Sequence, residues 1–460
     1  MISAPNRLRL SNGSSLMLAL GMVLFMGCAS SSSVSKRPKV ITPDRSTTKE
    51  VEEIPTRVDT ISWTFVPESE TPPISAESRV ESFRLDKSVK ERYRVALLLP
   101  MRLETVQPNL DANNRKFAEF YAGFKLAAEG ISNVNLDIKT YYTNRDLNTL
   151  DRILQDLEFY NPDLVIGSYE SEVIKRTAEW GRENRVPVIS PWLSSTKVAE
   201  DNVFYLQLRP SITSYYEEML RHINDNYEGS EVVLLGREEQ DATKNRILRR
   251  LQEELSPTPL ANVYQELYVE EEELMEGDSI FYEAFELGAK AFVLPHYSSS
   301  RDDRYVYSCL RKLYAEQAER EFTVYTMPIL LRSERIDLNM LKNLNTRTIE
   351  FRFPDQRDPE IQQIRENYYR TYGWLPGDDA YYGYDLLQFI ALGLEEHGQY
   401  FHYYMAGQTI DLSQMKIHIE PYFKDENEML DDRSRPDFMS NRHLYVIAYE
   451  NDHFVIKDIR

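Results

Sequence analysis

From Tyr93 onward the hydrophobic positions alternate between short continuous runs and helical spacing. Residues 94–100 form an apolar run ended by proline, which is typical of a strand buried on both faces. Residues 117–129 then place apolar side chains on one side of a helix. The pattern continues with strands expected at 136–142, 163–167 and 187–190 and helices at 147–160 and 171–184. This order predicts a parallel sheet with helices on both faces.

The same alternation then repeats in the second half of the chain. Helices are expected at 215–226, 242–254, 279–287 and 305–318, and strands at 231–235, 263–268, 291–294 and 322–327. About 365 residues are too many for one open sheet, so we predict two similar α/β lobes. We place the first lobe at about residues 91–208 and 335–400, and the second at about 209–334 and 401–460.

The first ninety residues have a different character. Arg7 and Arg9 precede an apolar run at 16–26, which is shorter than the roughly 20 residues that span a bilayer, so the run indicates a signal-peptide core. Gly27-Cys28 follows it and resembles the lipobox of bacterial lipoproteins. The resemblance implies that residues 1–27 are removed and that Cys28 carries acyl chains. The alternative is an uncleaved membrane anchor with a chance cysteine.

Residues 28–90 show no sustained apolar period. They contain a serine run at 30–33 and scattered prolines among Thr, Glu and Lys. Such a composition buries too little surface to offset the entropy of ordering, so we predict a disordered tether.

Composition and charge exclude several classes of function. The formal net charge of −20 disfavours binding to nucleic acid. If Cys28 is lipidated, Cys309 has no intramolecular partner, and its position in an apolar helical pattern predicts a buried small hydrophobe. No nucleophile, phosphate-loop or metal-ligand motif is present. We therefore expect no enzyme activity, no metal and no cofactor.

Several local patterns together resemble the type I periplasmic binding proteins, the leucine-binding-protein-like fold. The patterns are 95–100, 163–171, 186–191, 208–211, the late helix after Pro376 with Tyr384-Asp385, and the closing hairpin 441–456. The likeness covers residues 93–460. It implies two Rossmann-like lobes with parallel sheets around a central cleft, in which a ligand sits at the carboxyl ends of the strands.

The resemblance also implies candidate ligand-binding residues in that cleft. Ser171 matches the serine that helps to hold a ligand carboxylate, and Ser168 precedes it in the same loop. Ser194 falls where the family often has Ser or Thr. For Ser171 and Ser194 the alternative is helix capping without a ligand. Candidate residues also include Trp192, His296 and Tyr297, and a purely structural role is the alternative for His296.

The chain departs from the amino-acid binders of this family at several positions. The carboxylate that receives the ligand ammonium is replaced by the stretch 327–331, Met-Pro-Ile-Leu-Leu. Trp192 and Leu193 stand where a small residue is usual, and the loop 101–115 is extended. A standard α-amino-acid pocket is therefore not expected.

The resemblance predicts a membrane-anchored solute-binding lipoprotein of the cell envelope, similar to the substrate-binding components of ABC transporters. Its partner would be a small polar ligand, an amino acid or a peptide-like molecule, and we expect an outer-membrane anchor that faces the periplasm. The alternative is a protein-interaction lipoprotein that regulates an envelope enzyme such as a peptidoglycan synthase. That plan resembles the lipoprotein activators of penicillin-binding proteins.

Overall fold

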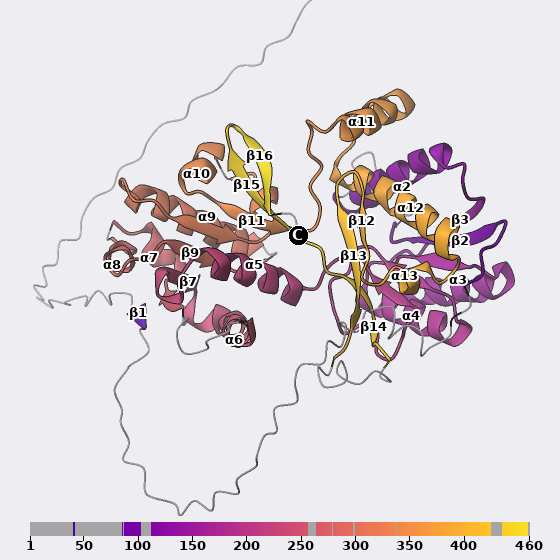
Figure 1. The fold of residues 1–460 in the computed structure, drawn as a ribbon, viewed down its shortest axis with the longest axis horizontal. Helices are drawn as coiled ribbons and strands as arrows, with labels where there is room; N and C mark the ends of the chain where they lie inside the picture. The colour runs from indigo at the N-terminus through magenta and orange to yellow at the C-terminus, as the bar shows by residue number, and fades with distance from the viewer. Residues whose placement is uncertain are drawn as a thin grey trace, which may run out of the picture. The chain divides into compact units, whose positions relative to one another are not determined.

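The computed structural model describes residues 40–41, 85, 87–102, 112–255, 264–277, 279–297, 300–335, 337–424 and 435–458. The predicted signal peptide and Cys28 lie outside these residues. Within them the strands form two separate sheets (Figure 1). The first sheet contains β2 (Tyr93–Leu99), β3 (Leu136–Tyr142), β4 (Leu164–Ile166), β5 (Val188–Ser190), β6 (Tyr205–Gln207), β12 (Thr409–Asp411), β13 (Lys416–Tyr422) and β14 (Phe438–Asn441). The second contains β1 (Val40–Ile41), β7 (Val232–Gly236), β8 (Gln265–Tyr268), β9 (Ala291–Leu294), β10 (Thr323–Thr326), β11 (Arg347–Glu350), β15 (Tyr445–Glu450) and β16 (His453–Asp458).

The two sheets share five parallel strands in the same order, and in the first sheet β14 adds a sixth beside β6. The order is β3-β2-β4-β5-β6 in the first sheet and β8-β7-β9-β10-β11 in the second. Each order reverses between its first and third strands in sequence, and such a switch point opens a crevice at the carboxyl ends of the strands. The predicted α/β fold with two lobes is confirmed.

The apolar run of β2 is explained by helices on both faces of the first sheet. Val95 and Leu97 pack with α2 (Ala112–Gly130) and α12 (Asp378–His397). Ala96 and Leu98 face the other way, toward α3 (Leu147–Tyr160) and α4 (Ser171–Asn184). Strand side chains alternate between faces, so both parities must be apolar when both faces are covered.

Helices α2 and α12 approach each other closely because each has a glycine at the contact. A Cβ on Gly123 would collide with the backbone of Ala380, and one on Gly383 would collide with the backbone of Phe120. The two helices therefore lie side by side (Figure 1). The other helices that accompany the first sheet are α11 (Pro359–Tyr372) and α13 (Phe401–Tyr404).

The second sheet has its own helices and its own core. Phe292 and Leu294 of β9 pack with Val306 and Leu310 in a cluster separate from that of β2. Cys309 lies in this cluster, 1% exposed, and burial raises the pKa of its thiol to about 12, so the predicted buried small hydrophobe is confirmed. The helices and 3-10 turns that accompany the second sheet are α5 (Ile212–Asn226), η2 (Gly229–Glu231), α6 (Glu238–Leu255), α7 (Glu271–Met275), α8 (Tyr282–Glu286), α9 (Ser300–Glu316), η3 (Leu330–Arg332) and α10 (Leu338–Asn343).

The membership of the two sheets differs from the predicted lobe segments in two places. The chain crosses between sheets at 208–212, 351–358 and 441–445. Residues 335–350 therefore accompany the second sheet through β11, where the sequence predicted the first lobe. Residues 401–441 accompany the first sheet through β12, β13 and β14, where the sequence predicted the second. β11 and β13 carry polar residues beside apolar ones and have no continuous apolar run. Each has an antiparallel neighbour on the side toward the sheet edge.

Two parts of the predicted tether are ordered. Val40 and Ile41 pair with the edge strand β8 in antiparallel register, opposite Leu267 and Glu266. Leu85 is 4% exposed in the core of the first sheet, and Lys90 forms an ion pair with Asp163. The folded body therefore begins before Tyr93. Within the part of the chain that the structure describes, no helix is long and apolar enough to cross a membrane.

Candidate ligand-binding site

The predicted serines of the first sheet lie in different environments. Ser168 follows β4 and is fully buried, with its hydroxyl 3.3 Å from the hydroxyl of Thr143, which follows β3. Ser171 is the exposed first residue of α4, whose N-cap is Glu170. Ser194 is half-buried in the loop after β5. The three serines are thus not gathered around one buried point, and their ligand contacts stay predictions.

Trp192 belongs to a cluster of aromatic side chains beyond the ends of β2 and β5. Its ring packs edge-on against Phe117 at 5.0 Å and Phe120 at 4.8 Å between centroids, and the side chain is 2% exposed. Tyr382 of α12 contacts Phe120, and Phe351 contacts Tyr382, both at 5.7 Å. Tyr169 completes the cluster at 5.5 Å from Phe117. Trp192 therefore fills the space between strand ends and helices, and its ligand contact stays a prediction.

Four cationic side chains lie over the rings of this aromatic cluster. The ammonium of Lys116 is 5.6 Å from the centroid of Phe117, and the guanidinium of Arg145 is 5.5 Å from the same centroid. The guanidinium groups of Arg209 and Arg352 lie 5.9 and 5.4 Å from the centroid of Phe351. Each contact is a favourable cation–π interaction in a partly desolvated place.

Arg209 links the strand ends of the two sheets. It follows β6, and one guanidinium nitrogen donates to the hydroxyl of Tyr297 at 2.7 Å, while another donates to the carbonyl of Trp192 at 3.3 Å. Tyr297 follows β9 of the second sheet and packs edge-on against Tyr215 at 5.3 Å. Of the predicted residues, the structure therefore brings Tyr297 and Trp192 together through Arg209. In the sequence, Arg209 stood out only as part of the pattern 208–211, and its place in this site was not predicted.

The carboxylates nearby are already paired with other cations. Asp379 lies 3.0 Å from Arg352, and Glu350 lies 3.0 Å from Arg332, which follows β10. Glu170 lies 3.4 Å from Arg145. Among the described residues, neither Lys116 nor Arg209 has a carboxylate oxygen within 4.0 Å. The site therefore has two cations without a carboxylate partner.

The pKa of Lys116 reflects both its burial and the charges around it. The pKa of its ammonium is lowered to about 8, chiefly by burial; the charges of Arg352, Arg209 and Arg332 add to the lowering, and Asp379 opposes it. We name Lys116, Arg209, Arg332 and Arg352 the cationic cluster. Its members come from helix α2, from two of the three crossings between the sheets and from η3, so sequence spacing offers no signal for their convergence.

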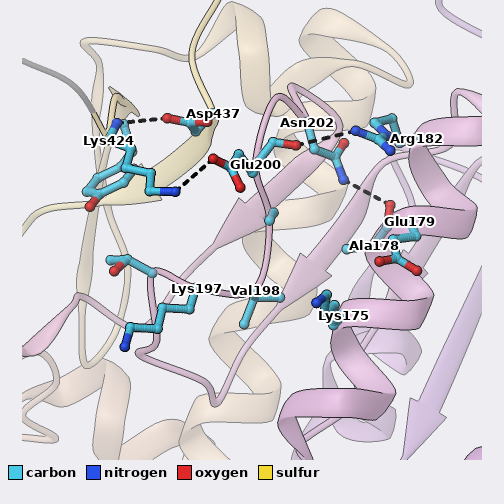
Figure 2. A pocket seen from close by; sticks show the side chains of 13 residues that line it. Lys175, Ala178, Glu179, Arg182, Lys197, Val198, Glu200, Asn202, Lys424 and Asp437 are labelled. Carbon is cyan, nitrogen blue, oxygen red and sulfur yellow. Dashed lines mark hydrogen bonds and ion pairs between the residues drawn. The ribbon is translucent and has the colours of Figure 1, made fainter.

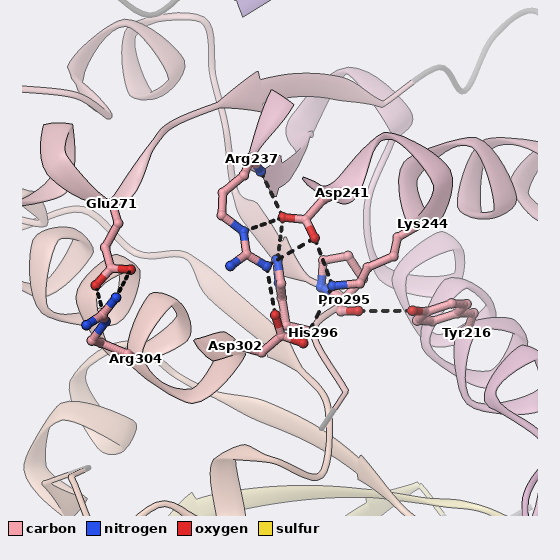
Figure 3. A network of polar contacts seen from close by, with 9 residues as sticks. All are labelled: Tyr216, Arg237, Asp241, Lys244, Glu271, Pro295, His296, Asp302 and Arg304. Atoms are coloured by element: carbon pink, nitrogen blue, oxygen red, sulfur yellow. Dashed lines mark hydrogen bonds and ion pairs between the residues drawn. The ribbon is translucent and has the colours of Figure 1, made fainter. Parts of the chain in front are cut away.

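The corresponding strand ends of the second sheet carry a neutralised network (Figure 3). Asp241 of α6 accepts from Arg237 at 2.8 Å, pairs with Lys244 at 2.8 Å and lies 3.0 Å from Nε2 of His296. Asp302 takes a second nitrogen of Arg237 at 2.7 Å. Two carboxylates thus offset two cations.

His296 lies inside this network. The side chain is fully buried, and burial lowers the pKa of its imidazole against the opposing effect of Asp241, so the ring is neutral near pH 7. Burial alone would raise the pKa of Asp241, but the hydrogen bonds from His296 and Arg237 outweigh it and hold that pKa well below its usual range. His296 therefore has specific partners inside the protein, as expected for a purely structural histidine. Its contact with a ligand stays a prediction.

Two pockets open elsewhere on the described surface. One of about 490 Å³ is lined by α4, the loop 196–202 and the ends of β13 and β14 (Figure 2). Lys424 and Glu200 pair across it at 2.8 Å. The other, of about 280 Å³, lies between the first turns of α5 and strands β12 and β13. Neither pocket includes a predicted site residue.

Comparisons with known proteins agree with this architecture. The model of the family described as the receptor family ligand-binding region matches residues 124–421. A solved putative branched-chain amino acid ABC transporter protein from Rhodospirillum rubrum is 14% identical, covers 79% of this chain and 99% of its own, and has a TM-score of 0.56.

Two further solved structures are similar. A branched-chain amino acid ABC transporter periplasmic ligand-binding protein from Burkholderia xenovorans is 10% identical, covers 80% and 94% of the two chains, and has a TM-score of 0.52. An ABC transporter substrate-binding protein from Desulfitobacterium hafniense in complex with Leu is 13% identical, covers 80% and 100%, and has a TM-score of 0.50. At these identities the likeness shows the fold alone. No curated protein sequence matches the chain.

Proposed function

Because this chain belongs to the receptor family ligand-binding region, with the fold of the type I periplasmic binding proteins, we propose that it is a solute-binding lipoprotein of the bacterial cell envelope. Its ligand is a small polar molecule held where the chain passes from the first sheet to the second. The observation that carries this proposal is the contact of Arg209 with Tyr297, since it joins polar side chains from the strand ends of both sheets at 2.7 Å.

Physical arguments support binding at this place rather than in either described pocket. In open α/β sheets ligands bind beyond the carboxyl ends of the strands, and Arg209, Arg352 and Tyr297 all follow such ends. Two crevices of this kind joined by crossing segments form a site that closes by hinge motion. The buried Nε of Arg209 has no hydrogen-bond partner among the described residues, which leaves a donor for a ligand.

Ligand binding is tested by the thermal unfolding of the full-length chain in detergent, measured with amino acids, peptides and muropeptide fragments. A ligand at 100 times its dissociation constant should stabilise the protein by about 2.7 kcal/mol. Arg209→Gln should abolish this stabilisation. Lys424→Gln, in the pocket of Figure 2, should leave it unchanged. Stabilisation that is equal in both variants would place the ligand elsewhere.

The anchor is tested at Cys28, which lies outside the described residues. In the proposed pathway lipidation precedes cleavage, so Cys28→Ser should leave an unprocessed precursor that takes up no labelled fatty acid. Cys309→Ser is the matched control and should label like the wild type, because its thiol is buried. Equal labelling of the wild type and Cys28→Ser would contradict the proposed anchor.

A second candidate function is a regulatory contact with an envelope enzyme such as a peptidoglycan synthase. The observation that favours it is a group of exposed aromatic and apolar side chains at the end of α11. Tyr369, Trp374 and Leu375 are each more than half exposed, and Trp374 packs against Tyr372 at 5.8 Å between centroids. Exposed Trp and Tyr side by side are typical of protein contact surfaces.

Crosslinking in cells separates this function from solute binding. A crosslinker placed at Tyr369 should recover one envelope enzyme, and Trp374→Ala should remove the product. A crosslinker at Phe159, which is 88% exposed on α3, is the control for unspecific capture. Recovery of a transporter permease alone would favour the first proposal.

A further inference from the structure

We propose that the ligand carries at least two negative charges and that Lys116 and Arg209 bind these charges directly. This inference rests on the proposed function, because it assigns a chemical class to the ligand of the same site. The expected compounds are small dicarboxylates, tricarboxylates or phosphate esters, in place of the zwitterionic amino acids that the family resemblance suggested.

The geometry gathers positive charge at one place. Arg209 and Arg352 lie against the same ring, Phe351, at 5.9 and 5.4 Å from its centroid. Arg209 also holds the carbonyl of Trp192, whose ring packs on Phe117, and Lys116 lies over Phe117 at 5.6 Å. The two cations without carboxylate partners are therefore anchored to the same aromatic cluster. The planar fork of Arg209 suits a carboxylate or phosphate, and Lys116 adds a point charge.

The pairing of the nearby carboxylates decides between an anion and a zwitterion. An amino-acid ligand needs an acidic side chain for its ammonium, but Asp379 is paired with Arg352 and Glu350 with Arg332, each at 3.0 Å. Glu350 also accepts from the hydroxyl of Tyr215 at 3.3 Å. An ammonium would have to break one of these partly buried pairs, which is costly. A second anionic group would instead find Lys116 without an ion-pair partner.

The burial of Lys116 points the same way. The pKa of its ammonium is lowered chiefly by burial, and the charges of Arg352, Arg209 and Arg332 act in the same direction against the attraction of Asp379. An anion that binds beside Lys116 would stabilise its charged form. The whole chain has a net charge of −20, so this concentration of positive charge is not a general property of its composition.

Calorimetric titration of the full-length protein in detergent tests the proposal with four probes. Citrate and inorganic pyrophosphate carry several negative charges, acetate carries one, and leucine is a zwitterion. Citrate or pyrophosphate should bind at least tenfold more tightly than acetate and leucine. Arg209→Gln and Lys116→Met should each weaken that binding at least tenfold, whereas Lys197→Met, an exposed lysine of the Figure 2 pocket, should not. Binding should also weaken above pH 8, where Lys116 loses its proton.

A second measurement covers ligands outside this panel. The wild type, Arg209→Gln and Lys116→Met are each incubated with a bacterial metabolite extract, washed, and the retained small molecules identified by mass spectrometry. Retained multianions that both variants lose would support the proposal. Retention of zwitterions that depends on Arg209 would overturn the anionic class while the proposed solute binding stands. If the wild type retains nothing and binds no probe, solute binding itself is refuted together with the anionic class.

Discussion

The strand ends of the two sheets share a topology but differ in how they balance charge. In the second sheet, Asp241 and Asp302 offset Arg237 and Lys244 at distances of 2.7 to 3.6 Å, and His296 completes the network. In the first sheet, Lys116 and Arg209 are set over aromatic rings without a carboxylate partner among the described residues.

This difference is the one expected between a structural cluster and the proposed binding cluster. Charged groups taken out of water are retained when they are paired, so the second network is satisfied without a ligand. In the cationic cluster, Lys116 and Arg209 have no carboxylate partner among the described residues. Such an imbalance of charge lowers stability and is typical of functional sites. Strand order alone would have assigned the two places equal roles.

The largest expected effect is the loss of the carboxylate at the centre of the second network. Asp241→Ala leaves Arg237 buried without its i+4 partner, and it also removes the acceptor for His296. Breaking a buried pair costs roughly 3 to 5 kcal/mol, so chemical denaturation should show a loss of that size. Glu271→Ala is the control, because its partner Arg304 is 62% exposed in the same region (Figure 3), and it should cost less than about 1 kcal/mol. Similar losses in both variants would contradict the comparison.

In the first sheet we expect the loss of a charged side chain to increase the stability of the protein. Lys116→Met removes a charge that burial makes costly to hold, so the ligand-free protein should gain roughly 1 to 3 kcal/mol of stability near pH 7. The folded protein releases this proton near pH 8 and the unfolded chain near 10.5, so the unfolded state binds more protons between these values. Wild-type stability should therefore receive a rising contribution from pH 8 to 10.5 that Lys116→Met lacks. Lys197→Met should stay within about 0.5 kcal/mol of the wild type at any of these pH values.

The smallest expected effects concern the serines that begin helices in the two halves. Ser211 caps α5, because its hydroxyl accepts from the amide of Ser214 at 3.1 Å, and Ser211→Ala should cost about 1 kcal/mol. Ser171 is the first residue of α4 but not its cap, so Ser171→Ala should change the stability by less than about 0.5 kcal/mol. Thermal unfolding checks both. A loss above 1 kcal/mol for Ser171→Ala would restore helix capping as its role.

Much of the parallel fold was predictable because the buried strands are apolar on both faces. β2, β7 and β9 are continuous apolar runs, and the helices between them keep the spacing of amphipathic helices. β11 and β13 were missed, since their alternating polar residues resemble loops when only the sequence is read. The burial of Leu85 was missed for a related reason, because one apolar residue in a polar stretch carries no period.

The site was less predictable than the fold. Tyr297 was expected near the ligand and does contact Arg209, while Trp192 lies in an aromatic core that no motif indicated. The pairing of Asp379 with Arg352 joins residues 27 positions apart, across a crossing and a helix, and no spacing rule reports it.

By itself, the sequence determined the alternation of strands and helices, the two parallel sheets and the likeness to two-lobed binding proteins, because burial fixes which positions must be apolar. Only the tertiary structure decided which charges meet. Lys116, Arg209, Arg332 and Arg352 are dispersed over more than two hundred residues, and their interaction depends on distances that packing alone sets. Electrostatic energy falls with distance and with exposure to water, so neither the surplus of positive charge at one sheet nor its balance at the other can be read from the order of residues.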